Sequence, residues 1–183
     1  MSVINEIDVQ ALQDITTAVQ AEPELGQATL SVNGSWQGGL RLAAQTGAMT
    51  QGGERDETRA AKFTMRSDEP AGLLGTDTAV SPGEYILQAL AGCYTATLAI
   101  LASAQDIELK GVQVELEGDV DYRGFLGLDP SVRPGLQQVR VRLHVDAPGT
   151  PRERLEELVA LVESRSPIRD TLVNPVDVVT TLA

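Results

Sequence analysis

The chain has 183 residues, of which 42% are hydrophobic, so it is long enough for one domain with an appendage and too apolar for wholesale disorder. Its net charge of −12 argues against a nucleic-acid partner, because phosphate neutralisation needs clustered Lys and Arg. One Cys and one His exclude a disulfide within the chain and a Cys/His zinc site.

The first residues contain no basic region followed by an apolar run of signal-peptide type. No apolar stretch reaches the ~20 residues that a membrane-spanning helix requires. We therefore expect a cytoplasmic protein without a membrane partner.

The N-terminal segment places its apolar residues at helical spacing from about residue 2 to residue 21, and Pro23 follows. This pattern predicts a short amphipathic helix that packs as an addition to the fold. We therefore expect two parts, a helical extension at residues 1–26 and a main domain at residues 27–183.

From residue 27 onward the pattern changes to alternation, which is typical of strands. Strands are predicted at 29–33, 40–45 and 62–66, with a turn at 33–39. The polar, Gly-rich stretch 46–59 is expected to be a mobile loop.

A long helix is predicted to begin at Ser81 and to end near Gln105. Ser81 is a favoured N-cap residue, Pro82 suits the first helical position, and Glu84 completes a capping box. The many small residues and few charges after Glu84 indicate a central, buried helix.

The remaining chain predicts a hairpin of two long strands at 112–122 and 139–145, joined by a loop. A helix follows from a second capping box at Thr150-Pro151-Arg152-Glu153, then a short helical turn from Ser166-Pro167 and a last strand at 176–182. This order lacks regular βαβ alternation and indicates an α+β fold.

Motifs of phosphate loops, dinucleotide folds and serine hydrolases are absent from the sequence. His144 alternates with apolar residues on its strand, so we expect a surface histidine. Asp119 and Asp121 share one strand face and are interpreted as a solvated pair. No pattern indicates a metal or a cofactor.

Cys93 lies about three turns into the long helix, too far for the helix dipole to activate it. A free Cys is often only a small buried hydrophobe, whereas a reactive one needs a stabilised thiolate. Its position alone leaves both interpretations open.

The segment from Pro82 to Cys93, PGEYILQALAGC, resembles the P-x-E-x-L-x-x-A-L-A-G-C helix of the OsmC/Ohr family. Further similarity lies in DEP at 68–70, LGTD at 74–77, DVDYRGFLG at 119–127, VRPG at 132–135 and SPIRDTL at 166–172. The resemblance covers about residues 28–183.

The resemblance implies an OsmC-like fold, with antiparallel sheets wrapped around a long buried central helix, in an intertwined homodimer. Family enzymes are thiol peroxidases that act on organic and fatty-acid hydroperoxides, with a peroxidatic Cys, an activating Arg and an orienting Glu. Carried over, Cys93 is the nucleophile, Arg41 the activating residue with Arg66 as second choice, and Glu84 the orienting residue.

The chain departs from the family pattern at two positions. Ser166 stands where the family places a second, resolving Cys, so an external thiol is needed to reduce oxidised Cys93. Gly83 follows Pro82 where well-studied members have Glu, and one residue on a helix is a rotation of ~100°. Glu84 can therefore face elsewhere.

These observations predict a one-Cys protein that reduces or senses organic hydroperoxides, with a hydrophobic or lipid-like ligand near the apolar helix face of Leu87, Leu90, Thr97 and Ile100. The first alternative is a non-catalytic, ligand-binding or stress-related OsmC-like dimer that has lost turnover. The second is a scaffold dimer in which Cys93 only packs.

Overall fold

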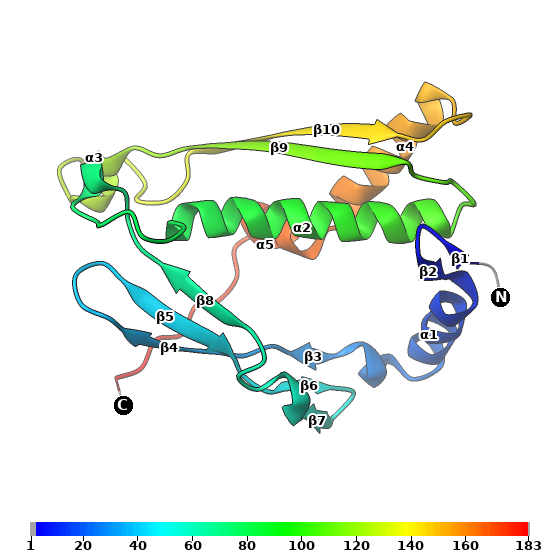
Figure 1. Ribbon diagram of the computed structural model, residues 1–183, viewed down its shortest axis with the longest axis horizontal. Helices are drawn as coiled ribbons and strands as arrows, with labels where there is room; N and C mark the ends of the chain where they lie inside the picture. Colours follow the sequence, from blue (N-terminus) through cyan, green and yellow to red (C-terminus); the bar gives the residue numbers. More distant parts are fainter. Residues whose placement is uncertain (1–2, 183) are drawn as a thin grey trace. The chain divides into compact units, whose positions relative to one another are not determined.

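The computed structural model describes residues 3–182 and divides the chain into two compact units. One unit combines the N-terminal residues up to 9 with residues from 86 onward, and the other comprises residues 10–85. Figure 1 shows the elements in chain order.

The N-terminal segment starts as a small hairpin of β1 (Val3–Ile4) and β2 (Ile7–Asp8), and its helix α1 (Val9–Ala21) begins later than predicted. Asn5 and Glu6 form the hairpin turn with φ angles of 53° and 62°, a region that Asn adopts more readily than most residues. The expected helix over residues 3–8 was therefore wrong, and residue 2 lies outside the described residues. After α1, Pro23 opens a 3₁₀ turn, η1 (Pro23–Gly26).

The Asn5 side chain fastens this hairpin to the end of the central helix. Its Nδ2 donates to Ser103 Oγ and to the Ile107 carbonyl, both at 3.0 Å, and its Oδ1 accepts from the Leu109 amide at 2.8 Å. Ser103 Oγ in turn donates to the Ile4 carbonyl at 2.9 Å. The hairpin thus belongs to the unit that contains residues 86 onward.

The unit of residues 10–85 contains two small antiparallel sheets. One has the order β3-β6-β7, with β3 (Ala28–Thr29), β6 (Met49–Gln51) and β7 (Glu54–Asp56). The other has the order β4-β5-β8, with β4 (Val32–Trp36), β5 (Leu42–Thr46) and β8 (Thr64–Ser67). The predicted strands at 40–45 and 62–66 are confirmed with shifted ends. The predicted strand at 29–33 is divided between β3 and β4, which belong to different sheets, and β4 continues through the first part of the predicted turn at 33–39.

The predicted mobile loop at 46–59 was wrong, because β6 and β7 form a hairpin there. Gly52 and Gly53 both have positive φ angles, 55° and 80°, as the favoured two-residue hairpin turns require. A 3₁₀ turn, η2 (Glu57–Arg59), follows, and Asp56 caps it by accepting from the Thr58 amide.

The segment before the central helix is organised by the buried carboxylate of Asp68. It accepts hydrogen bonds from the amide of Glu69 and from both the amides and the hydroxyls of Thr76 and Thr78. These hydrogen bonds hold the pKa of Asp68 far below its usual range, and the bond from the Thr76 hydroxyl has the largest effect. Between them lies η3 (Ala71–Leu73), and Gly75 passes so close to the Glu69 backbone that a Cβ would overlap it.

The central helix α2 (Pro82–Ser103) has the predicted capping box. The Ser81 amide and hydroxyl donate to Glu84 Oε2 at 2.9 and 2.8 Å, and the Glu84 amide donates to Ser81 Oγ at 3.3 Å. By length and composition α2 could cross a membrane, contrary to the prediction that no such segment exists. Because Leu90, Tyr94 and Leu98 are buried in a core cluster, we interpret α2 as a core helix.

Strands β9 (Gly111–Asp119) and β10 (Gln138–Asp146) form the predicted hairpin, in antiparallel register from Gly111↔Asp146 to Asp119↔Gln138. They run alongside α2 in Figure 1. Their inward residues, such as Val114 and Leu143, alternate with exposed ones. The predicted strand end and loop contain a short helix instead, α3 (Tyr122–Phe125), capped by Asp121.

Two helices follow, α4 (Arg152–Arg165) and α5 (Pro167–Val173). The predicted capping box at Thr150 was wrong, because Pro151 itself is the N-cap of α4 and has no side chain that accepts a hydrogen bond. The short helical turn predicted from Ser166-Pro167 is confirmed as α5, with Ser166 as its N-cap. The predicted strand at 176–182 was also wrong, because that segment has no regular secondary structure in the described chain.

The core of the unit containing residues 86–182 forms where α2, the β9–β10 hairpin and α4 meet. Leu98 and Val162 are completely buried and Leu158 is 1% exposed. The inward valines and leucines of the hairpin pack against this cluster. The predicted α+β class, with antiparallel sheets and a long central helix, is confirmed.

Candidate functional site

Cys93 lies at the boundary between the buried and exposed faces of α2. Its neighbours Leu90 and Tyr94 are 3% and 4% exposed, whereas Gly92 and Ala96 are exposed. Cys93 itself is half-buried and free. The Cys93 side chain therefore lies beside the core and remains partly accessible to solvent.

The Cys93 sulfur accepts a hydrogen bond from the hydroxyl of Ser166. Ser166 Oγ donates to Cys93 Sγ over 3.1 Å, across 73 residues of sequence. Ser166 is only 1% exposed, and its Oγ also accepts from the Arg169 amide at 3.3 Å as the N-cap of α5. The structure thus brings the single Cys of the chain into contact with Ser166, the position at which the family pattern has a second Cys.

Tyr94, the neighbour of Cys93 on α2, interacts with titratable side chains of two other helices. Burial raises the pKa of Tyr94 on α2, while Arg169 on α5 acts in the opposite direction and Glu163 on α4 reinforces the rise. The Arg169 guanidinium also donates to the Glu163 carbonyl at 3.3 Å. Arg169 is therefore a cation near Tyr94, the sequence neighbour of Cys93, and it lies inside the SPIRDTL motif although no role was predicted for it.

Glu84, the predicted orienting residue, serves the cap of α2. Its carboxylate accepts two hydrogen bonds from Ser81, and these bonds lower the pKa of Glu84. Nine residues separate Glu84 from Cys93 along the same helix, which corresponds to opposite faces and roughly 13 Å along the axis. The predicted capping role is confirmed, and the orienting role stays a prediction.

Arg41, the predicted activating residue, lies in the turn between β4 and β5. Its Nε donates to the Gly38 carbonyl at 3.2 Å and its guanidinium donates to the Gln37 carbonyl at 3.1 Å. Arg66, the second choice, is exposed on β8, where its backbone hydrogen-bonds the Tyr85 hydroxyl. Both belong to the unit of residues 10–85, so their roles toward Cys93 stay predictions.

Asp119 and His144 lie on the solvent face of the β9–β10 hairpin, as predicted, whereas the prediction that Asp121 shares this face was wrong, because β9 ends at Asp119 and Asp121 caps α3. Asp119 pairs with Arg140, and hydrogen bonds from that guanidinium lower the pKa of Asp119. His144 is half-exposed, with Nε2 3.4 Å from Glu115 Oε1. Cross-strand ion pairs of this kind stabilise a surface only weakly.

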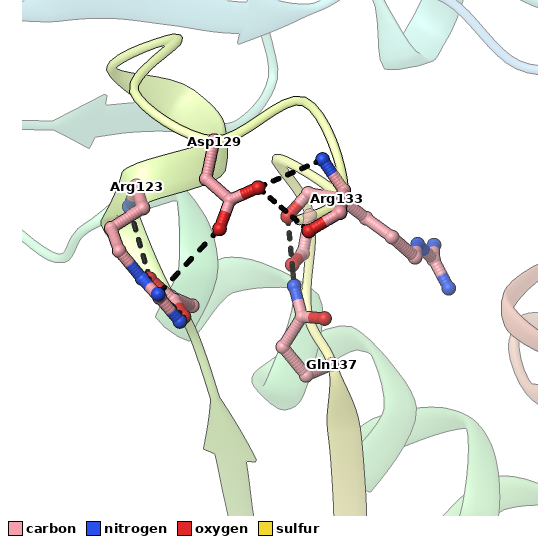
Figure 2. A network of polar contacts seen from close by, with 7 residues as sticks. Arg123, Asp129, Arg133 and Gln137 are labelled. Atoms are coloured by element: carbon pink, nitrogen blue, oxygen red, sulfur yellow. Dashed lines mark hydrogen bonds and ion pairs between the residues drawn. The ribbon is translucent and has the colours of Figure 1, made fainter.

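The loop beyond these strands is ordered by its own polar contacts, which Figure 2 shows. The Asp121 carboxylate accepts hydrogen bonds from the amide and the guanidinium of Arg123. The Arg123 guanidinium also forms an ion pair with Asp129, with 3.6 Å between Nη1 and Oδ2. Gln137 Nε2 donates to the Arg133 carbonyl at 2.8 Å. Asp121 is thus a structural residue of the loop rather than half of a catalytic carboxylate pair.

An open cavity of about 920 Å³ lies within the unit that contains residues 86–182. Tyr94, Val141, Leu143, Leu155 and Val159 supply much of its apolar lining. The apolar helix face predicted for a ligand is not part of it, and Leu90 of that face is buried in the core. Residues 3–182 contain no cluster of three or more side chains that could hold a metal ion.

The family model described as OsmC-like protein matches residues 75–181, which include Cys93 and Ser166. The chain belongs to the OsmC-like protein family. The match covers more than half of the chain, and it confirms the resemblance found in the sequence.

Solved structures of this family share the fold of the chain at low identity. An OsmC-like protein from Mycoplasma pneumoniae matches with a TM-score of 0.64 and 17% identity, over 80% of this chain and 89% of its own. An organic hydroperoxide resistance protein from Legionella pneumophila matches with a TM-score of 0.56 and 19% identity, over 79% and 88%.

The organic hydroperoxide resistance protein OhrB of Bacillus subtilis matches with a TM-score of 0.52 and 19% identity, over 81% of this chain and 93% of its own. Identities of this size establish the fold alone. No curated protein sequence matches the chain.

Proposed function

We propose that this OsmC-like protein reduces or senses organic hydroperoxides through Cys93 as its single reactive thiol. The observation that carries the proposal is the contact between Cys93 Sγ and the buried Ser166 hydroxyl within the residues that match the family. Peroxide reduction requires a thiol in hydrogen-bond contact and partly open to solvent, because the thiolate is the nucleophilic form of Cys. The organic hydroperoxide resistance proteins of the same fold supply the substrate class.

In the proposed reaction the Cys93 thiolate attacks one oxygen of the hydroperoxide bond. The O–O bond breaks, Cys93 becomes a sulfenic acid, and the departing alkoxide takes a proton and leaves as an alcohol. Because the chain has one Cys, an external thiol must then form a mixed disulfide with Cys93 and release water. A second external thiol regenerates Cys93 and leaves as a disulfide with the first.

Arg41 as the activating residue and Glu84 as the orienting residue remain part of this proposal. Each now hydrogen-bonds a neighbouring turn or cap, and each must exchange those partners to serve Cys93. Arg169 is a further candidate cation, since it acts electrostatically on Tyr94, the sequence neighbour of Cys93, while its guanidinium donates to the Glu163 carbonyl.

The alternative is a protein that binds a ligand and no longer turns over. The replacement of the family's resolving thiol by Ser166 favours it, because Ser cannot form a disulfide with a sulfenic acid. A third outcome, a scaffold in which Cys93 only packs, predicts a thiol that peroxides do not oxidise.

One experiment separates these functions. The protein is treated with cumene hydroperoxide in the presence of a dimedone-type probe, with Cys93→Ser as the control, and the label is located by mass spectrometry. Labelling at Cys93 with consumption of peroxide and a thiol reductant supports a peroxidase. Labelling without turnover supports a sensor, and an unlabelled Cys93 with persisting hydroperoxide overturns the proposal.

We also propose that the protein is a cytoplasmic homodimer with a hydrophobic or lipid-like ligand. Within residues 10–85, Val32 and Trp36 of β4 are 61% and 75% exposed, and within the other unit Val178 and Val179 are 84% and 86% exposed. Exposed apolar residues in such number are typical of an association surface. Sedimentation equilibrium that gives the mass of one chain would contradict the dimer.

A further inference from the structure

We infer that Ser166 is a positioning residue that donates its hydroxyl hydrogen to the Cys93 thiolate and so sets the reactivity of the thiol. This inference rests on the proposed function of Cys93 and deepens it. It assigns to Ser166 a role of its own, distinct from that of the thiol which the family pattern places there.

The geometry leaves the Ser166 hydroxyl one acceptor among residues 3–182. Its oxygen already accepts from the Arg169 amide as the cap of α5, so its hydrogen is free to point elsewhere. The direction it takes is toward Cys93 Sγ, 3.1 Å away. Because Ser166 is 1% exposed, water does not compete for that hydrogen.

The two hydrogen bonds of Ser166 reinforce each other. Donation from the Arg169 amide into the oxygen polarises the O–H bond, which makes the hydroxyl a better donor to sulfur. A hydrogen bond to a charged acceptor is about twice as strong as one between neutral groups. The contact therefore stabilises the thiolate more than the thiol, and it stabilises an anionic sulfenate in the same way.

The fold holds this donor rigidly. The Ser166 amide donates to the Val162 carbonyl at 2.9 Å, so the residue continues the last turn of α4 while it caps α5. Val162 is completely buried in the core. The hydroxyl is thus fixed by two helices, and its distance to Cys93 does not depend on a mobile loop.

The test measures the rate at which iodoacetamide alkylates Cys93 as a function of pH, in the wild type and in three variants. Ser166→Ala and Ser166→Gly remove the hydroxyl, and Gly keeps most of the capping strength if Ala unfolds α5. Ser166→Thr retains the hydroxyl. The titratable groups Tyr94, Glu163 and Arg169 are the same in all four proteins.

We expect Ser166→Ala and Ser166→Gly to move the midpoint of the profile upward by about one pH unit and to slow alkylation at pH 7 by about threefold, because the thiolate fraction falls about tenfold while each thiolate becomes about threefold more nucleophilic. Ser166→Thr should restore the midpoint. A merely structural role would increase exposure of the sulfur, which moves the midpoint of a thiol downward and speeds alkylation, the opposite of the expected change. Unchanged midpoints in both variants, with the folded state verified by circular dichroism, overturn the inference.

The outcome is independent of the hydroperoxide experiment, because alkylation requires no peroxide. If the midpoint shifts but wild-type Cys93 resists cumene hydroperoxide, the proposed function fails and the role of Ser166 stands. If the wild type forms the sulfenic acid and the midpoint does not shift, the role of Ser166 fails and the proposed function stands.

Discussion

The substitution Ser166→Cys should create a disulfide with Cys93. The present side chains are in contact at 3.1 Å, and a disulfide brings its sulfurs to about 2 Å, roughly 1 Å closer. The backbone of residue 166 is held by both adjoining helices, so closure has to come from rotation of the two side chains. We expect the variant to be reduced when purified with dithiothreitol and to oxidise readily with diamide.

The stabilisation follows from the loop that the bond closes. Residues 93 and 166 are 73 positions apart, and the chain-entropy relation gives about 4 kcal/mol for a loop of this length. For a chain of this size that corresponds to a rise in Tm of about 10 °C for the oxidised over the reduced variant. The reduced variant should be less stable than wild type by about 1 kcal/mol, because the cap of α5 is lost.

The assay combines a thiol count with thermal melts. Oxidised Ser166→Cys should show no free thiol and a mass lower by two hydrogens than its reduced form. Ser164→Cys is the matched control, because Ser164 is exposed on α4 two residues away and its hydroxyl bonds the Leu161 carbonyl instead. If Ser166→Cys keeps both thiols after diamide treatment while folded, the contact between Ser166 and Cys93 is refuted.

Three further substitutions test other parts of the structure. Glu84→Gln keeps the capping-box pattern but removes the charge, so it should lower stability only slightly; slower Cys93 alkylation would support the orienting role, and unchanged alkylation would contradict it. Leu98→Ala should lower the free energy of unfolding in urea by about 2–5 kcal/mol, because Leu98 is fully buried, and a smaller loss would contradict tight packing there. Asp68→Asn should lower the urea midpoint at pH 7. Because the folded pKa of Asp68 is depressed, its stabilisation is present above the ordinary Asp pKa and fades in more acidic solution, so wild type and variant should converge there.

The sequence was most informative where structure depends on neighbouring residues alone. The capping box of Ser81 and Glu84 and the short helical turn from Ser166-Pro167 were predicted because each involves residues within one helical turn. The long hairpin was predicted because its alternation extends over nine residues in each strand.

The errors occur where a local pattern fits two structures. Gly52-Gly53 suits a loop as well as a hairpin turn, and only the pairing of Met49 with Asp56 decides between them. Residues 176–182 alternate as a strand does, yet a strand needs a partner with unpaired backbone groups, which the sequence cannot locate. At the N-terminus, helical spacing concealed a turn that tertiary hydrogen bonds of Asn5 hold in place.

For the candidate site, the sequence supplied Cys93 and Ser166 as separate positions in two motifs. That they are in contact follows from the packing of α4 and α5 against α2, which depends on burial of Leu158 and Val162. Arg169 was not predicted to matter, because no sequence pattern indicates that it lies near Tyr94, which is more than seventy residues earlier.

The attachment of Asn5 gives the protein a built-in probe of local opening. The Leu109 amide hydrogen is held by Asn5 Oδ1, 104 residues away in sequence. Its exchange with deuterium therefore reports on detachment of the N-terminal hairpin, whereas amides within β9 report on opening of the long hairpin. Displacement of residues 3–8 would thus appear as fast exchange at a position in the middle of the chain.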